Sequence, residues 1–89
     1  MKLDELRKEL DEIDWQLLKL FHKRLDIAKK IGLVKKEKRL KVVNKNREML
    51  VINSRQEKGV QMGIDKTFIT NIWKLLMTES KKNQRGIIK

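Results

Sequence analysis

Residues 3–35, LDELRKELDEIDWQLLKLFHKRLDIAKKIGLVK, decide the fold of this 89-residue chain. Apolar side chains in this stretch recur at alternating steps of three and four residues, which is the spacing of one face of a long helix. They are Leu3, Leu6, Leu10, Ile13, Leu17, Leu20, Ile27, Ile31 and Val34. Between Leu20 and Ile27, the expected apolar position is occupied by Arg24. A buried cation is costly unless an anion or a hydrogen-bonding group meets it, so Arg24 is a candidate functional residue.

The remainder of the chain predicts two shorter helices, and hence an all-α single domain over residues 1–89. Gly59 is expected to cap the end of the second helix, and Asp65 is expected to cap the start of the third. The three helices are expected over roughly residues 3–36, 42–58 and 65–84.

The unequal lengths of these helices predict an intertwined homodimer. At 1.5 Å per residue, the first helix is roughly 50 Å long and the other two are roughly 25–30 Å long. Two short helices stacked on one half of the long one leave much of its apolar stripe bare. A second copy of the chain covers the remainder in a symmetric dimer.

The composition limits the kinds of ligand and site. The formal net charge is +11, which favours anionic ligands: nucleic acid, an anionic membrane or small carboxylates. The chain has no cysteine and a single histidine, so no metal site is expected. No apolar run approaches the roughly 20 residues of a membrane span, and the helix pattern begins almost at Met1 without a leader. We therefore expect a cytoplasmic protein with no membrane partner.

Basic residues on the long helix form a possible anion site. Arg24 and Lys35 are eleven residues apart, which puts them on nearly the same face of the helix, about 16 Å apart along its axis. They are therefore placed to bind opposite ends of a small anion. Arg7 lies roughly 25 Å from Arg24 and cannot share a small ligand with it on one straight helix. It is placed to reach a ligand held by a partner subunit.

Each shorter helix carries a polar cluster near one end. Asn44, Arg47 and Glu48 share one face of the second helix, and Ser80 and Gln84 share one face of the third. Taken separately, these residues have ordinary structural explanations. The cluster on the second helix is explained as a solvated charged face, and the cluster on the third helix as ordinary surface. Arg24 is explained by an ion pair with Asp26 or with a glutamate of a partner.

Together, these positions resemble the all-helical (AroQ-type) chorismate mutase family. The resemblance runs without a gap from Leu3 to Gln84. It begins in LRKELDEIDWQLLKLFHKRLDIAKKIGLVK, where the family has an early Arg, an Arg before an Ala, and a Lys three residues after a Gly. It continues in NKNREM, where the family has D-x-x-R-E, and ends in ITNIWKLLMTESKKNQ, with a Ser and a Gln four residues apart.

The resemblance implies a three-helix chain that forms an intertwined dimer with two shared sites. The implied reaction rearranges chorismate to prephenate, on the route to phenylalanine and tyrosine, and needs no cofactor. By resemblance, Lys35, Gln84 and Arg24 are the catalytic residues, and Lys35 and Gln84 donate to the ether oxygen of the substrate. The implied substrate-binding residues are Arg7 from the other subunit, Arg24, Lys35, Asn44, Arg47, Glu48, Ser80 and Gln84. Asn44 departs from the family, which usually has Asp beside the substrate hydroxyl.

Three alternatives stay open. An isochorismate-pyruvate lyase of the same fold shares the Arg, Lys and Gln positions, although Glu48, placed for the chorismate hydroxyl, favours the mutase. A basic helical module that binds nucleic acid is suggested by the net charge, but no helix-turn-helix spacing or series of stacking aromatics is present, so no nucleic-acid partner is expected. The third alternative is a helical dimer whose site has decayed.

Overall fold

The computed structural model describes residues 2–88 and consists of three helices, with no strand among those residues. The helices are α1 (Leu3–Glu37), α2 (Lys45–Gln61) and α3 (Lys66–Ile88). The expectation of an all-α chain with one long helix and two shorter ones is confirmed. Met1 and Lys89, the ends of the predicted domain, lie outside the described residues.

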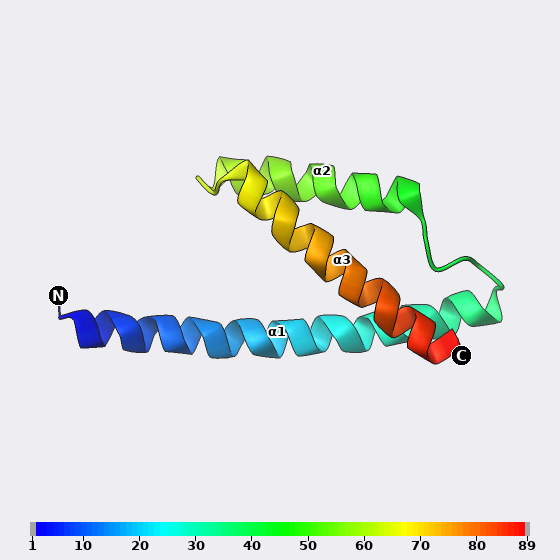
Figure 1. The fold of residues 1–89 in the computed structure, drawn as a ribbon, viewed down its shortest axis with the longest axis horizontal. Helices are drawn as coiled ribbons and strands as arrows, with labels where there is room; N and C mark the ends of the chain where they lie inside the picture. Colours follow the sequence, from blue (N-terminus) through cyan, green and yellow to red (C-terminus); the bar gives the residue numbers. More distant parts are fainter. Residues whose placement is uncertain (1, 89) are drawn as a thin grey trace.

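The helix α1 runs along the bottom of the view in Figure 1. It ends at Glu37, one residue after the predicted boundary. Asp4 and Glu5 lie in its first turn, and Lys35 and Lys36 lie in its last turn, so both ends complement the helix dipole. The molecule measures 55 × 24 × 14 Å, and α1 spans its long axis.

The helix α2 begins three residues later than the sequence predicted, at Lys45 instead of Val42. The Asn44 side chain accepts a hydrogen bond from the Arg47 backbone N–H at 3.0 Å, so Asn44 is the N-cap. The Val42 carbonyl lies outside the helix, where it accepts from Lys35 Nζ at 2.7 Å. The start of α2 is therefore fixed by a cap and by a contact from α1.

Gly59 does not cap α2, because the helix continues to Gln61. Gly59 is buried inside the last turn, where a Cβ atom would collide with the Ile69 side chain of α3. The turn is instead made at Gly63, whose φ of 80° lies in the left-handed region that glycine tolerates. Asp65 then caps α3 as expected, since its Oδ2 accepts from the Phe68 N–H at 2.9 Å.

The helix α3 connects the other two, because it packs closely on both α1 and α2, whereas the backbones of α1 and α2 do not come close to each other among the described residues. Figure 1 shows α3 crossing from the end of α2 to the C-terminal half of α1. It reaches Ile88, beyond the predicted end at Gln84. At Gly32 the backbones of α1 and α3 are so close that a Cβ atom would lie 2.9 Å from Gln84 Cα.

The N-terminal half of α1 carries an exposed apolar stripe. Leu3, Leu10 and Leu20 are each about 60% exposed, and Ile13 and Leu17 are also exposed. Among the described residues, the buried apolar side chains are instead Ala28, Val51 and Ile69, one from each helix, and on α1 every residue before Arg24 is exposed. The single chain therefore covers only the C-terminal half of its longest helix.

Candidate functional site

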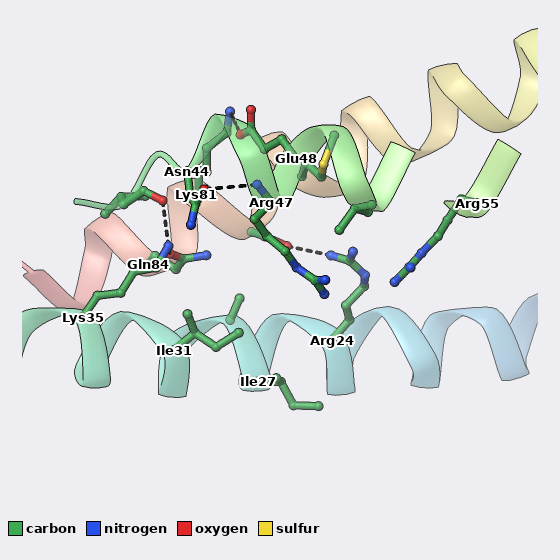
Figure 2. A pocket seen from close by; sticks show the side chains of 15 residues that line it. Arg24, Ile27, Ile31, Lys35, Asn44, Arg47, Glu48, Arg55, Lys81 and Gln84 are labelled. Carbon is green, nitrogen blue, oxygen red and sulfur yellow. Dashed lines mark hydrogen bonds and ion pairs between the residues drawn. The ribbon is translucent and has the colours of Figure 1, made fainter. Parts of the chain in front are cut away.

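A cavity of about 410 Å³ lies between the three helices at the C-terminal half of α1 (Figure 2). Every candidate site residue except Arg7 lines it. These are Arg24 and Lys35 from α1, Asn44 from the cap of α2, Arg47 and Glu48 from α2, and Ser80 and Gln84 from α3. The structure thus brings together side chains that are up to 60 residues apart in the sequence.

Lys35 and Gln84 meet at one end of the cavity. Lys35 Nζ donates to Gln84 Oε1 at 2.9 Å and to the Val42 carbonyl at 2.7 Å. Burial lowers the pKa of Lys35 from its usual value, and the Glu48 carboxylate opposes that shift. Gln84 is only 7% exposed, and because its carbonyl oxygen accepts from Lys35, its amide nitrogen is left as a donor. This end of the cavity therefore presents two hydrogen-bond donors from two different helices.

Arg24 lies at the opposite end of the cavity (Figure 2). Its Nη1 donates to Ser80 Oγ at 2.7 Å, which ties α1 to α3 and leaves the other guanidinium donors for a ligand. The structural alternative of an Arg24–Asp26 ion pair is not seen, since Asp26 pairs with His22 at 3.7 Å. Burial, and then the charge of Arg55, lowers the pKa of Arg24.

Asn44, the N-cap of α2, and the α2 residues Arg47 and Glu48 line the cavity from the α2 side. The carbonyl oxygen of Asn44 caps α2, so the amide nitrogen is the group that it has left for a ligand. The Glu48 carboxylate pairs with Lys81 Nζ of α3 at 2.7 Å. These two residues also line a second cavity of about 520 Å³ between α2 and α3, so their ion pair lies at the boundary between the two cavities.

The charge of the cavity wall is strongly positive. Five basic side chains line it, against the one carboxylate of Glu48: Arg24, Lys35, Arg47, Arg55 and Lys81. The uncharged part of the wall combines three polar side chains, Asn44, Ser80 and Gln84, with the apolar residues Ile27, Ala28, Ile31, Val42, Val51 and Met77. A site of this kind suits a small molecule that combines several negative charges with an apolar ring.

Arg7 lies outside this cavity, near the far end of α1, where it is exposed. It is seventeen residues from Arg24 on one continuous helix, so it does not reach the site of its own chain.

Sequence reasoning missed two of the basic residues, Arg55 and Lys81. Arg55 follows Glu48 by seven residues and Val51 by four, so helical spacing alone places it on the cavity face of α2. Lys81 is three residues before Gln84, on a neighbouring face of α3. Both were hidden among the many basic residues of the chain.

Neither metal ligation nor membrane insertion is indicated by the described residues. Within residues 2–88, no group of three or more histidine, aspartate or glutamate side chains is placed to hold a metal ion. None of the three described helices has a stretch long and apolar enough to cross a bilayer.

Comparison with known proteins agrees with the resemblance. The family model of chorismate mutase type II matches residues 6–85. A T-protein of Haemophilus influenzae is 32% identical over 82 residues, which cover 92% of this chain. The aligned region is 22% of that T-protein, so the chain spans about a fifth of the length of this curated relative. The family match covers nearly all of the three helices and the whole of the cavity wall, and we conclude that this chain belongs to the chorismate mutase type II family, a family of isomerases.

Proposed function

We propose that the cavity between the three helices binds chorismate and is the site where it is rearranged to prephenate. The observation that carries this assignment is the contact between Lys35 Nζ and Gln84 Oε1 at 2.9 Å, at one end of a cavity rich in guanidinium groups. Chorismate is a dicarboxylate with an ether bridge and a ring hydroxyl, so it needs cations for its ends and donors for its bridge.

The chemistry requires no nucleophile and no base. The ether C–O bond breaks while a new C–C bond forms within the same molecule, and negative charge grows on the ether oxygen. Lys35 and the amide nitrogen of Gln84 are the donors for that oxygen, and their charge and dipole are fixed in place before the reaction begins. The remaining residues hold the compact conformer in which the two reacting carbons are close.

The carboxylates are assigned to the guanidinium groups. Arg24 and Arg47 offer planar forks that pair a carboxylate with two hydrogen bonds, which a lysine cannot do. Ser80 orients Arg24 through its 2.7 Å hydrogen bond. Glu48 is the acceptor for the ring hydroxyl, and Asn44 contributes its amide from the cap of α2.

The exposed stripe on α1 supports an intertwined homodimer as the working form. Leu3, Leu10 and Leu20 are about 60% exposed in a single chain, and a second copy that covered them would bury this apolar surface. In such a dimer, the partner's Arg7 completes each site. We place this protein in the cytoplasm, with chorismate and a second copy of the chain as its partners.

A chorismate-depletion assay on the purified protein tests the assignment. Ultraviolet absorbance is followed with chorismate and, separately, with isochorismate. Loss of chorismate with formation of prephenate is expected. Loss of isochorismate alone would make the protein a lyase of the same fold, and no turnover of either substrate would favour a decayed site.

A further inference from the structure

Arg55 is a cavity residue that the family resemblance does not assign. It lies in the middle of α2, it is half-buried, and it lines the same cavity as Arg24 and Arg47. Figure 2 shows its side chain extending from α2 toward Arg24 on α1, at the end of the cavity opposite Lys35 and Gln84.

The two guanidinium groups come from helices whose backbones are not close to each other. Since the backbones of α1 and α2 stay apart within residues 2–88, the side chains of Arg24 and Arg55 reach into the space between them. Two like charges facing one cavity repel each other, and the charge of Arg55 contributes to the lowered pKa of Arg24.

No carboxylate of the described chain relieves this repulsion. Among residues 2–88, the carboxylates that lie within 4 Å of a basic side chain are those of Asp26, which faces His22, and Glu48, which pairs with Lys81. Arg55 Nη1 donates to Ser54 Oγ at 2.8 Å, which uses one of its five N–H donors. The remaining donors and the charge are left for a ligand.

We propose that Arg55 is a substrate-binding residue that pairs, together with Arg24, with one carboxylate of the bound dianion. An anion between two guanidinium groups removes their repulsion and gains charge-assisted hydrogen bonds from both forks. This inference rests on the proposed function, because the ligand is the chorismate dianion assigned to this cavity.

The position of Arg55 determines which kinetic constant it affects. It lies away from Lys35 and Gln84, so it does not act on the ether oxygen, where charge changes during the reaction. The carboxylate keeps its charge from substrate to transition state, so Arg55 stabilises both equally. Its loss therefore raises KM and leaves kcat nearly unchanged.

The test compares Arg55→Met, Arg55→Lys and the control Lys58→Met, which removes an exposed α2 cation outside the cavity. We expect Arg55→Met to raise KM for chorismate about tenfold, which corresponds to about 1.4 kcal/mol, with kcat within about twofold. Arg55→Lys should recover part of this loss, because it keeps the charge but not the fork. The difference in KM between Arg55→Met and wild-type protein should become smaller with added salt, because salt screens the charge of Arg55. A purely structural role for Arg55 would not produce this dependence on salt.

The outcomes separate this inference from the proposed function. If wild-type protein turns over chorismate and Arg55→Met has the KM of Lys58→Met, the role of Arg55 is overturned while the enzyme assignment stands. If wild-type protein does not turn over chorismate, both the role of Arg55 and the enzyme assignment are overturned. Thermal melting by circular dichroism checks each variant, and if Arg55→Met does not fold, Arg55→Lys decides: a KM equal to wild type then counts against the proposal.

Discussion

At the scale of single residues, the proposed function depends on two side chains that are already joined by a hydrogen bond. Lys35 comes from the last turn of α1 and Gln84 comes from α3, and they are joined at 2.9 Å. Because Lys35 and Gln84 are hydrogen-bonded to each other, neither side chain has to be reordered when a substrate binds. This is the condition under which fixed donors stabilise a transition state more than water does.

Removal of the Gln84 amide tests whether this fixed donor stabilises the transition state. Gln84→Ala is expected to lower kcat by about 10²–10³-fold, or about 3–4 kcal/mol, the scale for the loss of one preorganised donor. The control is Gln61→Ala, which removes an exposed amide at the end of α2. Steady-state kinetics give both values, and a kcat for Gln84→Ala equal to that of the control would contradict the role of Gln84.

The pKa of Lys35 predicts an alkaline limit to activity. Lys35 acts as a donor and counter-charge only when it is protonated, so activity falls as the pH rises through its pKa. Burial lowers that pKa, so the fall in kcat/KM, which reports the free enzyme, is expected at a lower pH than for an exposed lysine. In Lys35→Arg the residual activity should persist to higher pH, because a guanidinium stays protonated. The same alkaline limb in both proteins would show that another group is responsible.

At the scale of the helices, the apolar pattern determined which elements form, and local contacts determined where they end. The stripe on α1 was sufficient to predict that helix to within one residue at its C-terminal end. The boundaries of α2 were predicted less well, because its start depends on the Asn44 cap and its end on Gly63, while Gly59 serves the packing of α3. Arg55 and Lys81 were missed among the 23 lysine and arginine residues of the chain. Helical spacing puts Arg55 on the same face of α2 as Glu48, but the crossing of the helices decides whether that face lines a cavity.

Gly32 provides a test of the contact between α1 and α3. In Gly32→Ala the new Cβ meets the Gln84 backbone at 2.9 Å, so α3 must shift and carry the Gln84 side chain with it. We expect a loss of about 1–3 kcal/mol in the free energy of unfolding, together with a lower kcat. The matched control is Gly86→Ala in α3, where a Cβ atom meets nothing within 4 Å. Chemical denaturation compares the two, and equal stabilities would contradict the close approach.

At the scale of the whole molecule, two features of the single chain fit the proposed dimer and the proposed substrate. On α1 every described residue before Arg24 is exposed, including leucines that are about 60% accessible. A cavity wall with five cations also needs an anion to offset their mutual repulsion. The exposed leucines would be buried by a second copy of the chain, and the positive cavity wall would be neutralised by the substrate.

Mixing two variants that are each expected to be inactive tests the proposed shared site. Arg7→Ala and Arg24→Ala each damage both sites of a homodimer, but a heterodimer of the two keeps one site in which both arginines are intact. We therefore expect that mixing and refolding the two inactive variants restores up to about a quarter of wild-type activity, since half of the chains pair unlike and half of their sites are whole. Absence of rescue, with subunit exchange verified by mass spectrometry, would place Arg7 outside the site.

The separation between the backbones of α1 and α2 has a consequence for how the protein would respond to a ligand. Within one chain, α3 packs on both helices, and the segment before α2 is held to α1 by the hydrogen bond from Lys35 Nζ to the Val42 carbonyl. If the proposed dianion binds between Arg24 on α1 and Arg47 on α2, it adds a further link between these helices that is present only while the cavity is filled. Substrate binding is then expected to make the three-helix arrangement more rigid, and product release to relax it again.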